Sequence, residues 1–474
     1  MAFLNESHIE EADIQFFLDQ LGYAEHINAW EKKLVGRDNL KDVVLRDRLR
    51  TSLEKLNPAL PESCVDEAVY ALCKSRASMT PVLANKEVYF LIKNGVPVTY
   101  TNTEGQEENG YVKVIDFEHS QENDFVVVSQ LSILHQNVGL GFDQPTRRLD
   151  VLLYINGLPL VMIELKNANQ KVKSGYDVNL RRYKRDIPQL FWYNCFVCIS
   201  NGIQTRVGAF DAPWEHFFSW VKLKDTAITH EQMNRLEVEA ESEEKKNRLS
   251  LELFGRGLCN KDNLLDYYEN FTLYYNDKVK IIAKNHQFLG VNNAIRSLEN
   301  KEDKQGKLGV FWHTQGSGKS YSMIFFSRKI ERKVAGNWSF LIITDRKDLD
   351  AQIYRNFKDT GTITETNGQK ENFYRPSSRK QLQEYLQSNR SFLFSLIHKF
   401  GIEKGKTYPK LTDRDDWIVI VDEAHRTQYK GYGENMRIAV PNAQYIAFTG
   451  TPLLRSELTK DWFGPYVSEY NFAQ

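Results

Sequence analysis

The chain has 474 residues, of which 41% are hydrophobic and 26% charged, and its 62 basic and 62 acidic side chains cancel. Such values are ordinary for a globular protein of about three domains, and they exclude a disordered tail, a collagen-like fibre and a disulfide-stapled miniprotein. Because the net charge is zero, a DNA-binding surface would have to be a local patch.

The N-terminal stretch MAFLNESHIEEADIQ lacks a signal-peptide pattern, and the longest apolar runs are far too short to cross a bilayer. We therefore expect a soluble, cytoplasmic protein. The five scattered cysteines suit a reducing compartment. Cys195 and Cys198 form a lone CxxC in the apolar run CFVCIS, which favours buried strand residues over a metal site.

In chain order, residues 1–80 show helical spacing of apolar side chains, as in IQFFLDQLGY and VDEAVYALCK. Between residues 88 and 205 the runs become short and strand-like: VYFLI, YVKVIDF, DFVVVSQL, DVLLYI, LVMIEL and CFVCIS. Residues 226–280 are strongly charged with a helical pattern, and a solvated linker or helical face is the simplest interpretation.

The remainder alternates short apolar runs with longer helical segments. The runs are GVFW, FLIIT, FLFSLI, WIVIVD and YIAFTG. This alternation predicts an α/β fold with a parallel sheet.

The strongest motif, HTQGSGKS at residues 313–320, directly follows the run GVFW. Its glycines let backbone N–H groups point at phosphate oxygens, and the helix that begins there adds its positive dipole end. Lys319 would reach the terminal phosphates of ATP, and Ser320 would hold Mg²⁺. His313 stands where such loops usually have their first glycine. The predicted ATP-binding residues here are Thr314, Gln315, Gly316, Ser317, Gly318, Lys319 and Ser320.

WIVIVDEAH places Asp422 and Glu423 at the end of a predicted buried strand. Asp422 can ligate Mg²⁺, and Glu423 can take a proton from the attacking water. A loop acid pair after a core strand is a plausible alternative for this motif alone, but not for both motifs together in this order. A further strand, YIAFTGTP, ends at Thr449 and Thr451.

Together, TQGSGKS, DEAH and TGTP resemble motifs I, II and III of superfamily 2 helicases and DNA translocases. The resemblance implies a RecA-like lobe with ATP at the carboxyl ends of the strands, where open parallel sheets bind ligands. It also implies that His425, Thr449 and Thr451 couple ATP hydrolysis to movement. FLIITDRKDLDAQ is similar to motif Ia, so Arg346 would contact DNA, and Gln287 resembles the glutamine that reads adenine.

A second constellation lies in residues 148–166, RLDVLLYINGLPLVMIELK, which predict a hairpin around Asn156 and Gly157. Glu164 and Lys166 share one face of a strand, and Asp150 begins the preceding strand. The two carboxylates can hold Mg²⁺ and the lysine can position or polarise water, as phosphodiester hydrolysis requires. An internal ion pair is the alternative.

The hairpin geometry tests the nuclease hypothesis. With a regular two-residue turn Asp150 would lie opposite Ile163 and on the wrong face. Asp150 faces Glu164 only if the loop has three residues or a one-residue bulge intervenes. A nuclease site therefore predicts such an irregularity.

This arrangement resembles the PD-(D/E)xK nuclease core. More specifically, INGLPLVMIELKNA with its flanks IDFEHSQENDFVVVSQ and IPQLFWYNCFVCISNG, together with WHTQGSGKS, is similar to R subunits of type I restriction enzymes. Asn179 and Tyr183 align with the family's Gln-x-x-x-Tyr motif. The adjacent basic residues suit DNA phosphates, with a solvated helical face as an equal alternative. They are Arg181, Arg182, Lys184 and Arg185.

From the resemblance we expect a nuclease domain over 1–225 with a helical part over 1–80, a charged linker over 226–275 and a first RecA-like lobe over 276–474. The second lobe is absent, so we expect a fragment deficient in ATP turnover. The cofactors would be Mg²⁺ and ATP, with S-adenosylmethionine only through a partner methyltransferase. The partners would be double-stranded DNA and the modification and specificity subunits, and no membrane is expected.

Two other functions fit the same motifs. One is a helicase–nuclease of DNA repair or phage defence that acts without a methyltransferase. The other is a motor whose nuclease fold is a degenerate DNA-binding platform.

Overall fold

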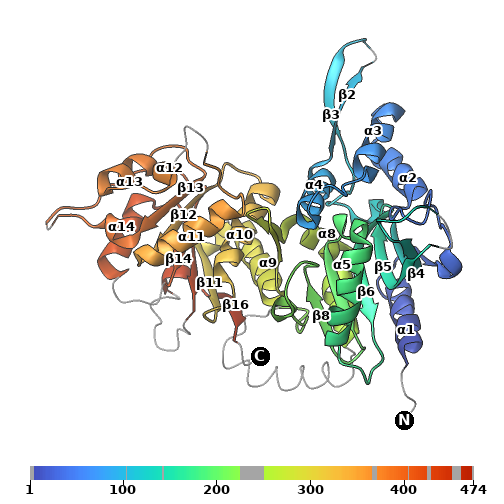
Figure 1. Cartoon of the computed structure of the whole chain (residues 1–474). Coiled ribbons are helices and arrows are strands. Elements are labelled where there is room, and N and C mark those ends of the chain that lie inside the picture. Colours follow the sequence, from blue (N-terminus) through green and yellow to red (C-terminus); the bar gives the residue numbers. More distant parts are fainter. Residues whose placement is uncertain are drawn as a thin grey trace. The chain divides into compact units, whose positions relative to one another are not determined.

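The protein is described by a computed structural model that covers residues 5–102, 104–140, 144–224, 250–365, 371–403, 405–423, 429–450 and 461–471 (Figure 1). The chain divides into two compact units. The first comprises Met1–Leu223 and Lys245–Ile282, and the second comprises Lys224–Glu244 and Ala283–Gln474.

The first unit is built on a six-stranded sheet with the order β1-β4-β5-β6-β7-β8. β1 is parallel to β4 and β6 is parallel to β7, whereas the other neighbours are antiparallel. Every residue of β6 is buried. The strands are β1 Glu25–Asn28, β4 Phe125–Leu134, β5 Thr146–Ile155, β6 Leu158–Leu165, β7 Phe196–Ser200 and β8 Thr205–Gly208.

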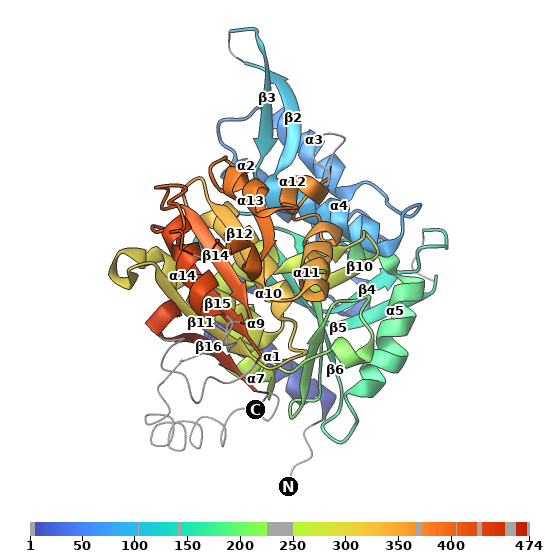
Figure 2. The ribbon, with the colours of Figure 1, turned by 90° about the vertical axis from the view of Figure 1, so that its left-hand side faces the viewer.

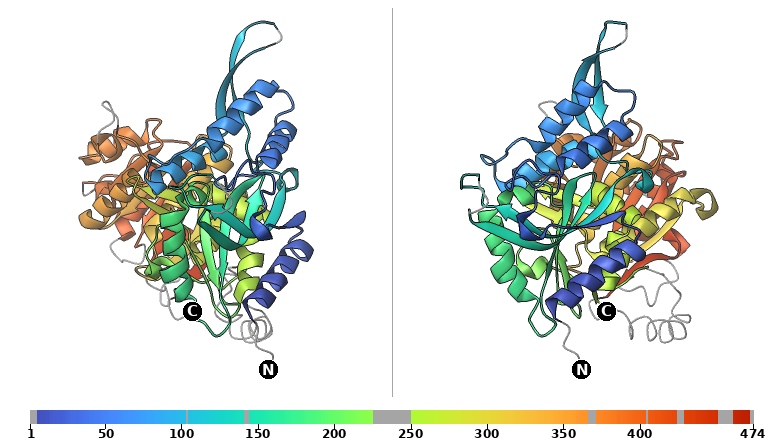
Figure 3. Two further views of the ribbon diagram at one scale, coloured as in Figure 1. Left: turned by 45° about the vertical axis from the view of Figure 1, so that its right-hand side comes forward. Right: turned by 90° about the vertical axis from the view of Figure 1, so that its right-hand side faces the viewer.

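Helices cover both faces of this sheet. Asp13 in α1 interacts with Cys198, whereas Gly175 in η3 packs on Ile199, and neighbouring strand residues point to opposite faces. Figure 3 shows α1 and α5 on different sides of the strands. The remaining elements before residue 224 are α1 Glu6–Asp19, η1 Trp30–Lys32, α2 Arg46–Leu56, α3 Glu62–Cys73, α4 Pro81–Asn94, η2 Ser120–Glu122, η3 Gly175–Leu180, α5 Arg181–Asp186, η4 Pro188–Trp192 and η5 Trp214–His216.

The apolar run VYFLI is not a strand, and this prediction was wrong. It lies in α4, whose first turn is capped by the Thr80 side chain and starts with a proline. The buried residues Val88, Tyr89 and Ile92 follow the helical period of three to four, which outweighs the high strand propensity of the individual residues.

An isolated antiparallel hairpin of β2 Val96–Thr101 and β3 Glu107–Val112 projects from the first unit (Figure 1). The two strands pair only with each other. Tyr111 on β3 is 67% exposed.

The expected linker over 226–275 lies partly outside the described residues. From residue 250 on, the chain forms α7 Ser250–Phe254, η6 Gly255–Cys259, α8 Lys261–Asn270, β9 Thr272–Tyr275 and β10 Val279–Ile282, all within the first unit. Phe254, Leu258 and Tyr267 are fully buried there, so the boundary between the units falls later than the charge pattern indicated. Because residues 230–249 are strongly charged, the apolar helical residues that follow them were assigned to the linker as well.

The second unit contains a six-stranded sheet with the order β13-β12-β14-β15-β11-β16, and all its neighbouring strands are parallel (Figure 2). The predicted parallel sheet is therefore confirmed, and β16 is a strand that the sequence pattern did not reveal. The strands are β11 Lys307–His313, β12 Ser339–Thr344, β13 Phe392–Leu396, β14 Trp417–Asp422, β15 Gln444–Thr449 and β16 Tyr466–Tyr470.

The helical elements of the second unit are α9 Asn285–Glu299, η7 Lys301–Lys304, α10 Lys319–Lys333, α11 Lys347–Asp359, α12 Glu371–Tyr374, α13 Arg379–Leu386, η8 Ile397–Phe400 and α14 Tyr429–Ala439. Among the helices of the described ranges, none has both the length and the apolar character needed to cross a membrane.

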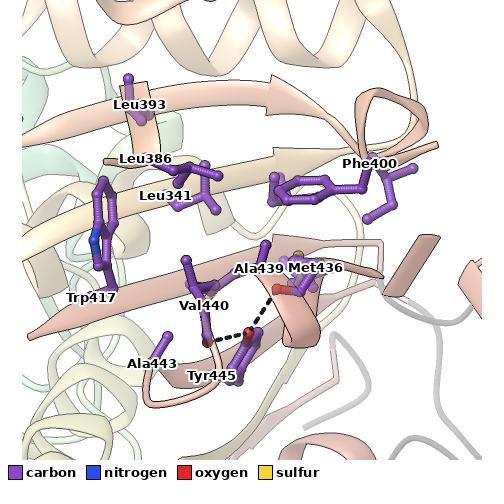
Figure 4. Close-up of a cluster of buried hydrophobic side chains, with 14 of the residues drawn as sticks. Leu341, Leu386, Leu393, Phe400, Trp417, Met436, Ala439, Val440, Ala443 and Tyr445 are labelled. Carbon is purple, nitrogen blue, oxygen red and sulfur yellow. Dashed lines mark hydrogen bonds between the residues drawn. The ribbon is translucent and has the colours of Figure 1, made fainter. Parts of the chain in front are cut away.

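A cluster of buried apolar side chains packs on one face of the second sheet (Figure 4). Leu341, Trp417 and Tyr445 come from three neighbouring strands, and Met436 and Val440 come from or just follow α14. The Tyr445 hydroxyl donates to the carbonyl of Val440 at 3.1 Å, so this buried polar group is satisfied. This packing fixes the strand ends at which the nucleotide motifs lie.

Candidate nuclease and nucleotide sites

The hairpin of β5 and β6 contains the predicted irregularity. Next to the Asn156-Gly157 turn, Tyr154 pairs with Pro159, but Leu153 pairs with Val161, so Leu160 is a bulged residue. The shifted register continues to the pair Val151 and Ile163, and the next position therefore sets Asp150 opposite Glu164. The prediction of a bulge is confirmed.

The three predicted nuclease residues lie together at the open end of this hairpin. The Leu165 N–H donates to the Asp150 carboxylate at 2.7 Å. The Lys166 ammonium lies 2.5 Å from Glu164 Oε1 and 2.6 Å from the carbonyl oxygen of Leu165. Glu164 is 1% exposed and Lys166 is 7% exposed, so both side chains are almost completely shielded from water.

The carboxyl groups of this site hold their protons more tightly than usual. Burial raises the pKa of Asp150 to about 6. Burial, and secondly the nearby Asp150 carboxylate, raise the pKa of Glu164 to about 8, although Lys166 opposes the shift. The mutual repulsion of two buried acids is relieved by a cation, which is the condition for a metal site.

Tyr183 and Asn179 support Glu164 from the helical side. The Tyr183 hydroxyl lies 3.0 Å from Glu164 Oε2 and 3.2 Å from the carbonyl oxygen of Arg148. The Asn179 side chain hydrogen-bonds the same hydroxyl. The structure thus brings the Asn-x-x-x-Tyr pair to the acids, and the shorter Asn179 acts through Tyr183.

Gly175 is a residue of this site that sequence reasoning missed. A Cβ atom there would lie 2.6 Å from Ile199 Cγ2, 3.4 Å from Glu164 Cγ and 3.5 Å from Lys166 Cε. Only glycine lets the first turn of η3 approach Ile199 this closely, and this approach brings the turn into contact with Glu164 and Lys166. A glycine shortly after the ELK triplet was the available signal.

A third carboxylate from α1 faces the same region and was also missed. Burial, opposed by a hydrogen bond from Gln130, raises the pKa of Glu10 to about 7, and Asp150 contributes to the shift. Gln130 lies opposite Asp150 in the register of β4 and β5, and its φ of 56° interrupts the regular pairing there. Its amide donates to Glu10 at 2.6 Å.

The four basic residues predicted to contact DNA lie on α5, directly after the η3 helix that contains Asn179. Arg181 and Arg182 are exposed, and Arg181 lies 3.7 Å from Asp177. Arg185 is exposed and donates to Asp186 at 2.7 Å, while Lys184 is half-buried. DNA contact by this helix stays a prediction.

The loop between β11 and α10 has the backbone that phosphate binding requires. Gly316 and Gly318 adopt φ values of 84° and 89°, which only glycine adopts without strain. Lys319 begins α10, and its ammonium lies 3.3 Å from the carbonyl of His313. Ser320 follows in the first turn, next to the N–H groups of the helix start. Thr314, Gln315 and Ser317 complete the loop.

The acid pair lies at the carboxyl end of β14, beside this loop. Asp422 is 4% exposed, and burial, then the Glu423 charge, raise its pKa to about 7, whereas Lys319 opposes the shift. A Cβ at Gly450 would lie 2.9 Å from Lys319 Nζ and 3.5 Å from Glu423 Oε1. The strand ends therefore bring motifs I, II and III to one place.

Gln287 contacts the loop backbone directly. Its side-chain amide donates to the carbonyl of Gly318 at 3.0 Å, and its oxygen accepts the Lys284 N–H at 2.9 Å. The neighbouring His286 lies 3.0 Å from the Ser317 carbonyl and stacks on Tyr470 with ring centroids 3.8 Å apart. Gln287 thus braces the phosphate loop, and its reading of adenine stays a prediction.

His313, which replaces the usual glycine, is a core residue. It is the last residue of β11, is fully buried and lies 2.6 Å from Ser468 Oγ. The Thr314 N–H donates to the carbonyl of Tyr470 at 3.1 Å. The unexpected strand β16 therefore accounts for a buried histidine at position 313, because Ser468 of β16 is the hydrogen-bond partner of its imidazole ring.

The remaining predicted residues are distributed as follows. Thr449 ends β15 and is fully buried. Arg346 is exposed at the start of α11. His425 and Thr451 lie outside the described residues. Cys195 and Cys198 are fully buried, as predicted, and within the described ranges no three His, Cys, Asp or Glu residues are grouped to hold a metal.

Two family models match the chain. The type I restriction enzyme R protein N terminus matches residues 3–216, and the SWI2/SNF2 ATPase matches residues 286–474. The HindI endonuclease subunit of a type I restriction enzyme from Haemophilus influenzae is 36% identical over 99% of this chain. A candidate type I MjaIXP endonuclease subunit from Methanocaldococcus jannaschii is 32% identical over 98% of it. The chain covers 44% of the length of each of these two relatives.

Among solved structures, a Type ISP restriction-modification enzyme, LlaBIII, bound to DNA superposes on 41% of this chain and 16% of its own, with a TM-score of 0.30 and 16% identity. This likeness is too low to add to the argument.

Proposed function

Because the chain belongs to the family of type I restriction enzyme endonuclease subunits, we propose that it carries the DNA-cleaving site and the first ATP-binding lobe of such an enzyme. The observation that carries the nuclease part is the bulge at Leu160, which turns Asp150 toward Glu164 and Lys166. No purely structural ion pair requires that register.

The donor set fits Mg²⁺. This ion takes one or two carboxylates and keeps several waters, so Asp150 and Glu164, with the Leu165 carbonyl beside them, suffice. When bound, Mg²⁺ supplies an activated water and neutralises charge on the leaving oxygen. The Leu165 N–H orients Asp150, Tyr183 orients Glu164, and the Lys166 ammonium is placed to hold the attacking water.

The ATP part rests on the loop at Gly316 and Gly318 and on the acid pair after β14. Thr314 to Ser320 would hold the phosphates, Asp422 would hold the Mg²⁺ of ATP, and Glu423 would accept a proton from water. His425, Thr449 and Thr451 would couple hydrolysis to DNA movement, and Arg346 would contact the DNA backbone. Translocation of double-stranded DNA and its cleavage away from the recognition site belong to the whole enzyme.

The proposed partners are DNA and the modification and specificity subunits, in the cytoplasm. The specificity subunit would recognise the DNA site, and S-adenosylmethionine would act only through the methyltransferase core. Co-purification with those subunits distinguishes this function from that of a helicase–nuclease which acts alone.

The test is plasmid cleavage. Supercoiled plasmid is incubated with Mg²⁺ or Mn²⁺ and either the wild-type chain or Asp150→Ala, and the same pair is compared in the assembled enzyme with ATP. We expect linear DNA from wild type only. Equal cleavage by both proteins, or equal restriction by both assembled enzymes, would overturn the assignment of Asp150.

A further inference from the structure

A loop beside the nuclease acids carries an exposed tryptophan that the proposed chemistry does not use. Trp30, in the short helix η1 after β1, is 45% exposed. The guanidinium of Arg148 lies 4.1 Å from the centre of its ring. The pair thus presents an aromatic ring and a positive charge side by side at the surface, an arrangement in which arginine commonly stacks on the ring.

Arg148 connects this pair to the nuclease site. It lies two residues before Asp150 on β5, so both side chains point to the same face about 7 Å apart along the strand. Its positive charge acts on the carboxyl groups of both Asp150 and Glu10. Its carbonyl lies 3.2 Å from the Tyr183 hydroxyl that also contacts Glu164. The Trp30–Arg148 pair is therefore at the rim of the catalytic cluster.

The loop of Trp30 is held in an unfavourable backbone conformation. Glu31, Lys32 and Val35 have φ values of 65°, 56° and 47°, which non-glycine residues rarely adopt, least of all a β-branched valine. Such backbone strain is typical of functional sites. The Trp30 N–H donates to the Asn28 side chain at 2.9 Å, which fixes the start of the turn.

A buried arginine maintains this conformation. Arg37 is 4% exposed, and its guanidinium donates to the carbonyls of Leu34 at 3.0 Å, Lys33 at 2.9 Å and Asp42 at 3.1 Å. It also donates at 3.1 Å to the carbonyl of Ser132, the β4 residue that pairs with Arg148. Arg37 thus anchors the loop to Ser132, the residue paired with Arg148. This anchoring holds the Trp30 ring beside the Arg148 guanidinium before any DNA is bound.

We propose that Trp30 and Arg148 form a DNA-strand clamp, in which Arg148 binds the phosphate next to the scissile one and the Trp30 ring stacks on the adjoining nucleotide. This inference rests on the proposed nuclease function. A cation and an aromatic plane side by side match the alternating phosphate and base of a nucleic-acid strand. Both are binding residues, and neither reacts.

The test measures binding of a fluorescein-labelled DNA duplex of mixed sequence to the whole chain in EDTA, where no cleavage occurs. Trp30→Ala is expected to weaken binding about tenfold with an unchanged salt dependence, and Trp30→Phe to restore most of it. Arg148→Gln is expected to weaken binding and to reduce the salt slope by about one. Tyr111→Ala removes another exposed aromatic of the same unit and should leave binding unchanged.

A second readout reports Trp30 directly. DNA should quench tryptophan emission in wild type, and Trp30→Phe should lose part of that quenching although seven of the eight tryptophans remain. Unchanged affinity in Trp30→Ala together with undiminished quenching in Trp30→Phe would overturn the clamp.

Loss of plasmid cleavage in Asp150→Ala would then still support the nuclease. Cleavage that survives in Asp150→Ala would remove the nuclease function, while the two binding readouts would still decide the clamp.

Discussion

Replacing Glu164 with glutamine is expected to change how the stability of the first unit depends on pH. Burial and the charge of Asp150 raise the pKa of Glu164 from its ordinary 4.5 to about 8. An acid with a raised pKa in the folded state keeps its proton after the unfolded chain has lost it, so the free energy of unfolding falls as the pH rises from 4.5 to 8. A shift of this size corresponds to up to about 5 kcal/mol, and the glutamine variant escapes this loss.

The assay is urea denaturation of the intact chain, followed by circular dichroism, at several pH values between 4.5 and 8. Relative to wild type, Glu164→Gln should gain stability steadily across this range. Glu62→Gln is the matched control, because that carboxylate is 80% exposed on the surface of the same unit. Its curve should run parallel to the wild-type curve.

Mg²⁺ provides the second half of the experiment. A cation that binds the ionised acids should restore stability to wild type at pH 8, and the gain should shrink as the pH falls toward 6, where the pKa of Asp150 also lies. Glu164→Gln should respond weakly or not at all. Parallel pH curves for wild type and Glu164→Gln would refute the electrostatic argument, and an equal response to Mg²⁺ in both would refute the metal site.

Three further predictions follow from the two sites. Lys319→Ala should abolish ATP binding, measured by calorimetry, with an unchanged circular dichroism spectrum, and unaltered affinity would remove the phosphate-loop assignment. Gly175→Ala should lower the melting temperature and plasmid cleavage, because its Cβ would lie 2.6 Å from a buried side chain, whereas Gly139→Ala, with nothing within 4 Å, should be neutral. Tyr183→Phe should reduce cleavage about tenfold at unchanged DNA affinity, since the hydroxyl 3.0 Å from the proposed catalytic carboxylate Glu164 is lost; a full rate in this variant would show that the contact is dispensable.

Local patterns predicted the second unit well. Five of its six strands were apparent as short apolar runs, because a parallel sheet buries both faces of each strand. The glycine-rich loop and the acid pair lie at the ends of those runs, so their proximity follows from the parallel arrangement itself. β16 was missed because its central residue alone is buried and its pattern YVSEY is not continuously apolar.

The bulge in the β5–β6 hairpin was also predicted, but not from local patterns alone. It followed from the requirement that a nuclease site bring the carboxylates of Asp150 and Glu164 together. The two-residue turn and the alternation of β5 allowed two registers, and the demand that Asp150 meet Glu164 selected one. The run VYFLI shows the opposite outcome, because strand propensity was followed where the helical period of α4 decided. Periodicity gives element type, whereas single-residue propensity is weak.

The sequence by itself determined the α/β class, the order of the two parts of the chain and the candidate site residues Asp150, Glu164, Lys166 and Lys319. These features depend on residues close together in the chain. Only the tertiary structure decided that Glu10 and Gln130 approach Asp150, that Gly175 packs on Glu164 and Lys166, and that Trp30 covers Arg148. Glu10 and Asp150, and likewise Trp30 and Arg148, are separated by more than a hundred residues, and no local spacing encodes which side chains meet when distant strands and helices pack.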